Sequence, residues 1–324
     1  MRKLICRSAL VLAAVVLWPG AAGAQSYPSK PVRVVIPWPA GGSNDIVGRV
    51  VMQKVGDALG QQFVIDNRPG ASGTIGADLV AKSPGDGYTL MVHSVTHLGN
   101  ATMYGKKLHY DTLKDFVPVA LLAQQPGGLI VHPSLPVRSV KEFVALAKSK
   151  PGQIFYSSSG NGSAPHLSMA QFIALTGIKI VHIPYKGGPP AVKAIVAGET
   201  QAMTATLATV IHHIRSKKLR LLAMTGAKRL RLMPEVPTIA EAGVPGYEMS
   251  PWIAVFAPSG TPAAILEKLN GEIAKALRMQ DVVKVLSNQA LEPWIASVAE
   301  FADRIQADHD KYARLIKESG AKIE

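Results

Sequence analysis

The segment from Val32 to Val51 constrains the fold of this chain more than any other part of it. A run of β-branched residues, typical of a buried strand, ends in Pro-Ala-Gly-Gly, and the pattern of a helix follows. Residues Ser43 to Asp45 are of the types that begin helices. Gly41 and Gly42 let a ligand approach the backbone N–H groups, and the first amides of the helix carry the positive end of its dipole. The segment therefore predicts a strand–loop–helix unit that holds a small anion.

The first 24 residues have the pattern of a secretory signal peptide. An apolar stretch spans Ala9 to Leu17, and small residues form a cleavage site near Ala24. Three basic residues precede the stretch: Arg2, Lys3 and Arg7. No later apolar run reaches the roughly 20 residues that span a bilayer. We therefore expect the mature protein to begin near Gln25 and to be soluble in the periplasm.

Cysteine content and net charge restrict the kinds of site and partner that the mature chain can have. The single cysteine, Cys6, lies in the predicted leader, so the mature chain has no thiol for a disulfide, a nucleophile or a metal site. Removal of the leader takes three of the 35 basic residues and none of the 22 acidic ones, which leaves a formal charge of +10. The basic residues are dispersed, so we expect anionic solutes and not nucleic acid as partners.

Strand and helix patterns alternate along the chain, as in α/β proteins. Strands are expected at 32–38, 62–67, 88–94, 153–160, 179–185, 201–207 and 219–226, and β character at 247–258. Helices are expected at 44–59, 75–82, 140–150, 166–176, 190–197, 209–217, 262–277 and from 297 onward. The mature length fits two domains, residues 25–123 with 252–324 and residues 124–251. The crossings at 116–131 and 247–257 are expected to form a hinge beside a ligand cleft.

Three pairs spaced by three residues predict helix starts in which a hydroxyl and a glutamate cap the backbone. They are Ser139 with Glu142, Thr238 with Glu241, and Ser297 with Glu300. The last helix carries Asp308 and His309 beside Lys311 and Arg314. We expect these charged residues on its solvated face.

Six segments resemble the Bug family of periplasmic solute receptors, the binding components of tripartite tricarboxylate transporters. In chain order they are PWPAGGSNDIVGR, DNRPGASGTIGADLVAKSPGDGYTL, SSSGNGSAPHLSM, PYKGGPPAVKAIVAG, LRLLAMTGAKRLRLMPEVPTIAEAG and WIAVFAPSGTP. The resemblance implies an α/β, two-domain periplasmic-binding-protein fold of the type II-like kind. Each domain is expected to be a mainly parallel sheet flanked by helices, with the two crossing segments as the hinge.

The resemblance also implies a receptor that closes on a small carboxylate and presents it to the membrane subunits of a transporter. Family members hold the carboxylate mainly through backbone amides and ordered waters of two facing loops, which here are Trp38–Asp45 and Ser158–His166. The resemblance leaves a membrane sensor kinase as an alternative partner. We expect a monomer without a cofactor.

The candidate ligand-binding residues fall into three groups. The first strand–loop–helix unit and the third strand supply Trp38, Ala40, Gly41, Gly42, Ser43, Asp45, Ser94 and His97. The facing loop supplies Ser159, Asn161, Gly162, Ser163 and His166. The strand ends of the second domain supply Tyr185, Lys186, Gly187 and Thr206. Lys186 is either a contact for a distal anionic group or an exposed lysine of a turn, and a bulky side chain at Gly41 is expected to block binding.

Other motifs predict neither a metal site nor catalysis. His93 and His97 flank a strand-to-loop change, and no carboxylate completes a metal set with them. GASGTIG differs from the dinucleotide fingerprint, and GNGSA lacks the second glycine of a nucleophile elbow. The cleft loops contain no carboxylate pair for acid–base chemistry. The alternative to a receptor is a periplasmic hydrolase or isomerase that uses the same cleft.

The identity of the solute stays open, because backbone amides recognise a carboxylate whatever it is attached to. Dicarboxylates, citrate-like tricarboxylates, acidic amino acids, aromatic acids and neutral amides all remain candidates. Gln201 stands where the family usually has an aspartate, which puts any transfer of ligand identity through that strand in doubt.

Overall fold

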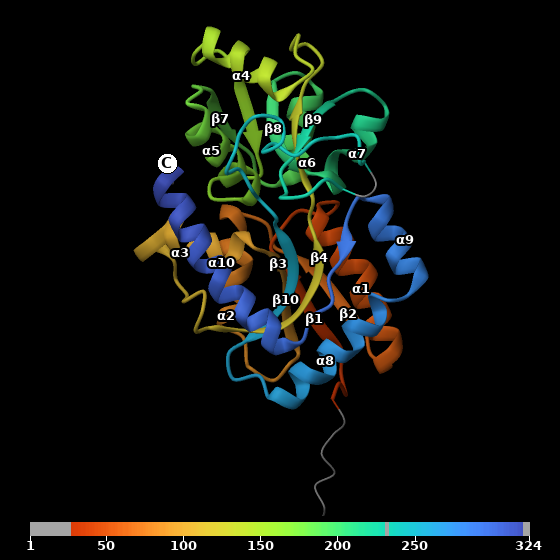
Figure 1. The fold of residues 1–324 in the computed structure, drawn as a ribbon. Coiled ribbons are helices and arrows are strands. Elements are labelled where there is room, and N and C mark those ends of the chain that lie inside the picture. Colours follow the sequence, from red (N-terminus) through yellow and green to blue (C-terminus); the bar gives the residue numbers. More distant parts are fainter. Residues whose placement is uncertain (1–26, 231–232, 320–324) are drawn as a thin grey trace, which may run out of the picture.

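The computed structural model describes residues 27–230 and 233–319, which form two bodies, each a β-sheet covered by helices (Figure 1). The predicted signal peptide lies outside these residues. Within the described ranges, no helix combines the length and the apolar character that crossing a membrane requires. The α/β class expected from the alternating patterns is confirmed.

The first body contains a six-stranded sheet in the order β11-β4-β10-β3-β1-β2. Its strands are β1 (Val32–Ile36), β2 (Phe63–Asn67), β3 (Thr89–Ser94), β4 (Phe116–Gln124), β10 (Trp252–Pro258) and β11 (Glu292–Pro293). β1 is parallel to β2 and β3, with Val34 opposite both Ile65 and Leu90. β10 lies antiparallel between β3 and β4.

The second body contains a five-stranded sheet in the order β7-β6-β8-β5-β9. Its strands are β5 (Gly127–Val131), β6 (Phe155–Ser158), β7 (Val181–Pro184), β8 (Ala202–Thr206) and β9 (Arg220–Met224). β6 is parallel to β7 and β8, whereas β5 is antiparallel to β8 and β9.

Both sheets are therefore mixed, and the expectation of mainly parallel sheets is wrong. In each sheet the strand that has just arrived from the other body runs antiparallel to both of its neighbours: β10, which follows β9, and β5, which follows β4. A crossover helix within one body produces a parallel neighbour, but a strand that enters from the other body needs no crossover and can run the opposite way. The chain passes between the sheets after Gln124 and before Trp252.

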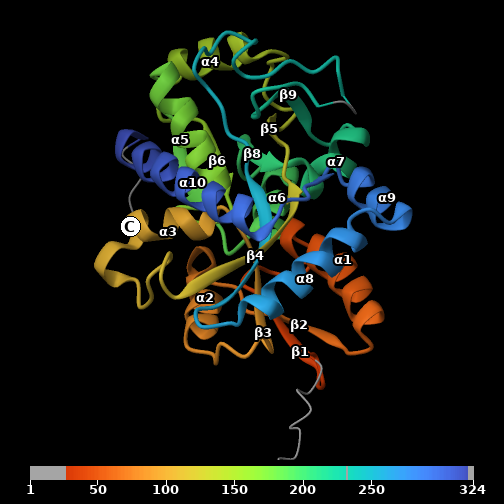
Figure 2. The ribbon, with the colours of Figure 1, turned by 60° about the horizontal axis from the view of Figure 1, so that its bottom comes forward.

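Helices cover both faces of each sheet (Figure 2). One face of the first sheet packs against α1 (Ser43–Leu59), α8 (Ala263–Ala276) and α9 (Gln280–Asn288). Its other face packs against α2 (Thr74–Ala81), α3 (Thr96–Tyr104) and α10 (Val298–Ser319). The second sheet lies between α4 (Val140–Ser149) with α5 (Ala164–Thr176) and α6 (Gly188–Val196) with α7 (Leu207–Arg215).

The C-terminal helix α10 contacts both bodies. It packs against α3 of the first body and α5 of the second, and both figures show it between them. Leu167 of α5 and Ile316 of α10 both lie next to Gly99 of α3. Lys311 of α10 is ion-paired at 3.5 Å with Glu248 of the second crossing segment. One continuous apolar cluster therefore extends from the first sheet into the second body.

The strands and longer helices expected from the sequence are present, but the patterns do not predict α3 or α9. Most of α3 is buried, so it has no polar face to reveal a helical period. After Thr238 the structure has turns instead of the expected helix. Thr238 and Glu241 do cap each other, with N–H to oxygen distances of 2.8 and 3.1 Å, but Gly243 follows too soon for a helix to extend. The pair formed by Ser297 and Glu300 caps α10 as expected.

Asp308 is buried, so the expectation that it is solvated is wrong. Its carboxylate accepts hydrogen bonds from Trp252 Nε1 and Arg304 Nε, both at 2.6 Å. Phe301 and Tyr312, which are seven residues before and four after Asp308, are buried on the same stripe of α10. The carboxylate thus joins α10 to the first residue of the central strand β10.

We predict that Asp308→Ala lowers the free energy of unfolding by about 2–3 kcal/mol, because it leaves a buried indole N–H and a partly buried guanidinium without their acceptor. Asp310→Ala, on the exposed side of the same helix, should change it by less than about 0.5 kcal/mol. Urea unfolding followed by circular dichroism measures both variants. Equal losses would contradict a specific role for Asp308.

Candidate functional site

A cavity between the two bodies lies where five helices begin. The first residues or N-caps of α1, α3, α5, α6 and α7 all contribute to its lining, together with Gln125 from the first crossing. The lining carries hydroxyl and amide groups and no charged side chain: Trp38, Pro39, Gly42, Ser43, Asn44, Ser94, Thr96, Gln125, Ser159, Ala164, Pro165, Gly188, Pro189, Met203, Ala205, Thr206 and Thr209. Because helix N-termini carry partial positive charge, this arrangement favours an anion.

The first turn of α1 offers free N–H groups at this cavity. No side chain caps the helix, and the first intrahelical bond runs from Ile46 N to Gly42 O at 3.0 Å. The N–H groups of Ser43 and Asn44 therefore have no acceptor within the helix. The Asn44 side chain is buried as well, and its Oδ1 has no hydrogen-bond partner. These groups are available to a bound solute.

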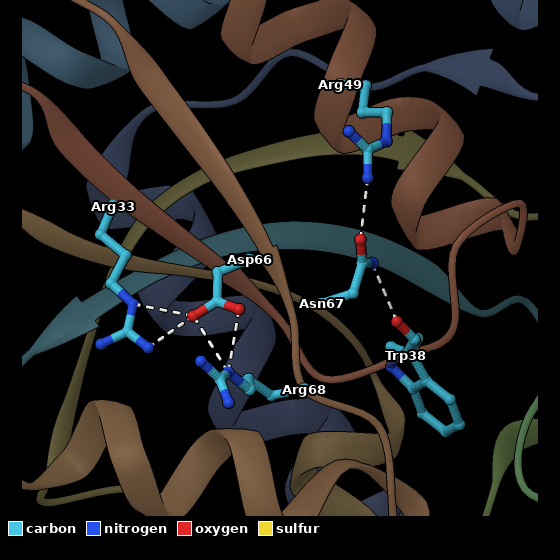
Figure 3. Close-up of polar contacts among 6 residues, drawn as sticks. All are labelled: Arg33, Trp38, Arg49, Asp66, Asn67 and Arg68. Carbon is cyan, nitrogen blue, oxygen red and sulfur yellow. Dashed lines mark hydrogen bonds and ion pairs between the residues drawn. The ribbon is translucent and has the colours of Figure 1, made fainter.

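Gly41 and Asp45 shape the loop and do not line the cavity. Gly41 has φ +78°, a value that favours glycine, and its N–H donates to Asp45 Oδ2 at 3.0 Å. Asp45 also accepts hydrogen bonds from Arg49 and Asn67. Figure 3 shows Asn67 bonded to the carbonyl of Trp38 and to Arg49. Burial by itself would raise the pKa of the Asp45 carboxyl, but the hydrogen bonds from Arg49, Gly41 and Asn67 outweigh it and lower the pKa.

Gly41 lines neither cavity. A Cβ at Gly41 would have no atom within 4 Å, so a substitution there is strained by the positive φ and not by a steric clash. The neighbouring Gly42 does line the cavity, and its φ of −76° accepts any residue.

The facing loop uses most of its N–H groups within the protein. Gly162 N donates to His166 Nδ1 at 2.9 Å, and Ala164 N donates to Thr96 Oγ1 of the first body at 3.0 Å. Ser163 caps α5 and donates its own hydroxyl to a backbone carbonyl of the loop. The expectation that this second helix start presents free amides is therefore wrong.

Trp38 forms one wall of the cavity, whereas His97 does not reach it. Trp38 Nε1 donates to Nδ1 of the fully buried His93 at 3.3 Å. His97 is enclosed by aromatic rings, with centroids of Phe116 and Phe256 at 4.5 and 5.1 Å. Burial lowers the pKa of His97 to about 3. Among the residues that the structure describes, no three His, Cys, Asp or Glu side chains are grouped to hold a metal ion.

A second cavity, of about 210 Å³, adjoins the first and shares Trp38, Pro39 and Ser159 with it. Its other lining residues are Gly70, Ala71, Ser72, Tyr104, Gly160, Asn161, Pro184, Tyr185, Lys186 and Gly187. Lys186 is the one charged side chain in the two described linings. The two adjoining cavities together give a site to which the second contributes a cation.

The two bodies touch each other beside this site. The Ser72 hydroxyl donates to the carbonyl of Asn161, and a Cβ at Gly187 would lie 2.6 Å from Pro39 Cδ. With the bond between Ala164 and Thr96, these contacts join the bodies across the cleft. In this structure the two bodies therefore contact each other across the cleft, in a closed arrangement.

The structure brings together ten of the seventeen predicted site residues. The two cavities are lined by Trp38, Gly42, Ser43, Ser94, Ser159, Asn161, Tyr185, Lys186, Gly187 and Thr206. The remaining seven line neither: Ala40, Gly41, Asp45, His97, Gly162, Ser163 and His166. Sequence reasoning missed Asn44, Ser72, Thr96, Tyr104, Gln125 and Thr209. Ser94 ends the third strand and Thr96 lies two residues after it, so its position near the strand end could have identified Thr96 as a site residue.

Ser158 and His182 are in contact, with Oγ and Nε2 2.6 Å apart. The Ser158 side chain is fully buried and also bonds the backbone of Gly160, so no substrate reaches it. The His182 ring stacks on His166 with centroids 4.1 Å apart. Burial lowers the pKa of His166 to about 4 and, with the nearby His166, that of His182 to about 3. We therefore interpret the contact between Ser158 and His182 as a structural support of the loop at 158–166, and not as a nucleophile with its general base.

Known proteins resemble this chain over most of its length. A sequence model of the family described as tripartite tricarboxylate transporter family receptor matches residues 47–321. The protein BugT of Bordetella pertussis is 38% identical over 301 residues, which are 93% of this chain and 92% of BugT. The solved structure of R. palustris Rpa4515 with adipate is 35% identical, with a TM-score of 0.88 over 92% of this chain and all of that one. MatC of Rhodopseudomonas palustris with bound malate is 30% identical, with a TM-score of 0.84 over 90% of this chain and all of MatC.

The buried histidines predict how stability depends on pH. Their pKa values are lowered by folding, so between about pH 6.5 and 4 the unfolded chain binds protons that the folded chain does not. Stability should therefore fall as the pH falls, by about 1.4 kcal/mol per pH unit for each such histidine. His97→Phe, which fits the aromatic surroundings, should reduce this slope by about that amount in urea titrations at several pH values. Replacing the exposed His212 with Gln should leave the slope unchanged, and an unaltered slope in His97→Phe would refute the assignment.

Proposed function

Because this chain belongs to the family of tripartite tricarboxylate transporter receptors, we propose that it is a solute-binding receptor that captures a small carboxylate between its two bodies. The observation that carries the proposal is the cavity at which five helices begin, with the uncapped first turn of α1 exposed in it. Two structurally similar proteins have adipate and malate bound, which supports a carboxylate as the solute.

The first turn of α1 holds one carboxylate group of the solute. The N–H groups of Ser43 and Asn44 donate to it, and an ionised acceptor makes these bonds stronger than a neutral one. The hydroxyls of Ser94, Thr96 and Thr206 lie in the same lining and add donors. The N-termini of the other helices contribute positive potential without a formal charge.

The second cavity receives the rest of the solute. Trp38 borders both cavities and packs against the body of the molecule. Lys186 is in the lining of the second cavity, where its ammonium group can pair with a second anionic group of the solute. A solute with two anionic ends therefore uses more of this site than a monocarboxylate does.

The receptor works by closing, not by catalysis. The chain divides into residues 25–123 with 252–324 and residues 124–251, and the hinge is formed by the two crossing segments. The contacts of Ser72 with Asn161 and of Thr96 with Ala164 belong to the closed form. The cavity linings offer no acid–base pair, and Ser158 is sealed from solvent, which argues against a hydrolase.

The receptor is exported to the periplasm after cleavage near Ala24, and it delivers its solute to the membrane subunits of a tripartite transporter. A sensor kinase as the partner would use the same closed form. Ligand-dependent association with a kinase, and not with transporter subunits, would identify that case.

We predict that the mature protein from Gln25 binds one dicarboxylate or tricarboxylate, detected by thermal shift and then by calorimetry, and that the solute is recovered unchanged. Ligand at 100 times its Kd should stabilise the fold by about 2.7 kcal/mol. Gly42→Val should raise Kd at least about tenfold, a loss of about 1.4 kcal/mol, because its methyl groups enter the cavity beside the N–H donors.

Gly271→Val is the matched control, since Gly271 is exposed on α8 and a Cβ there meets nothing within 4 Å. Conversion of the solute would replace the receptor proposal with an enzyme. A panel of carboxylates without a single binder would refute it.

A further inference from the structure

The positive charge of this protein is concentrated in residues 124–251, which hold the second sheet. This segment contains 14 Lys and Arg residues, five Glu and no Asp, a formal charge of +9. The rest of the chain after residue 24 contains 18 basic and 17 acidic residues, a formal charge of +1. The two bodies therefore differ sharply in charge although they have similar folds.

The cations of this segment also lack carboxylate partners. Of its 13 described basic side chains, only Arg229 is ion-paired, with Glu241 at 2.8 Å. Outside the segment, nine of the 17 described basic side chains are ion-paired. Unpaired surface cations stabilise the fold little and leave a positive field that an anionic partner can neutralise.

Five of these cations lie on one layer, which we call the basic face: Lys193, Arg215, Lys217, Lys218 and Lys228. They come from α6, the end of α7, the turn after it and the loop after β9. Ile195, Val210, Leu219 and Leu230 from the same elements share one apolar cluster, which places these elements side by side. Figure 1 shows α6, α7 and β9 together in the upper body. All five cations are exposed. Glu199 and Glu235 are exposed acidic residues on these loops, and Glu241, further along the loop after β9, is paired with Arg229.

The basic face is linked to the solute site by α6 and α7. Both helices begin at the cavity, where Gly188 and Thr209 line it, and both end at the basic face with Lys193 and Arg215 in their last turns. A partner on this face therefore contacts the far ends of two helices whose near ends face the solute.

We propose that the basic face is the surface by which the closed receptor docks on an acidic extracytoplasmic surface of a membrane protein. This inference rests on the proposed function, which supplies a membrane-bound recipient. A protein surface fits better than a lipid surface, because none of the described residues of this face exposes a large apolar side chain that could insert between headgroups. The described large exposed apolar residues lie elsewhere: Val64, Ile75, Leu113, Phe155, Leu175, Val181, Met279, Val285 and Ile295.

Binding of the full mature protein to right-side-out membrane vesicles from the cells that produce it tests this docking. Lys193→Glu, Arg215→Glu and Lys218→Glu combined should weaken binding at 0.15 M salt at least tenfold. Lys141→Glu, Lys148→Glu and Lys150→Glu combined change the net charge equally at exposed positions on or just after α4, and should leave binding within about twofold. Proteolysis of the vesicle surface should abolish binding of the unaltered receptor.

Three results would overturn the proposal: equal weakening in both triple variants, unchanged binding in the first, or equally tight binding to protein-free phosphatidylglycerol vesicles. Thermal unfolding checks that both variants are folded. A thermal shift with the solute separates this proposal from the proposed function, because docking variants should bind the solute normally. If no carboxylate binds, the proposed receptor function is refuted, whereas the vesicle measurement still tests the docking proposal.

Discussion

The structure depends on the pairing of β10 with β3 and β4. This strand is buried along its whole length and enters the middle of the first sheet directly from the second body. Gln125 N donates to Pro251 O at 2.8 Å, so the two crossing segments are hydrogen-bonded to each other where they pass between the bodies. Because an antiparallel strand in this place completes the sheet, the chain must return here before α8, α9 and α10 can pack.

The first crossing segment also contacts the cavity that we propose holds the solute. Gln125 bonds the Ser43 hydroxyl at the start of α1, so the crossing segment and the anion-binding helix turn are in contact. This hydrogen bond therefore joins the first crossing segment to the start of α1. Asp45, held by Arg49, Asn67 and the Gly41 amide, keeps the loop folded around the free N–H groups. A site built from backbone dipoles needs such support, since the donors themselves have no side chains to reorient.

The two bodies divide the work of the protein differently. The first supplies most of the directed donors and is nearly neutral, whereas the second supplies the unpaired positive charge. The lining of the first cavity has no charged side chain and uses the partial charges of helix termini, whereas the lining of the second contains one cation, Lys186. The helix α10, which touches both bodies, makes part of the core common to them.

The sequence by itself predicted most of the helices and strands, although not α3, α9, β4 or β5, and it predicted the loop and helix start at Gly42 and Ser43 that line the first cavity. Local periodicity and N-cap residues predict α1 after the loop at Gly41 and Gly42, since these signals act over a few residues. Tertiary structure decided which donors are free. The amides of Gly162 and Ala164 are taken by His166 and by Thr96, the latter 68 residues away, and no local pattern reports such a partner. It also placed His97 among aromatic rings and Asp308 against Trp252, because burial depends on packing between distant segments.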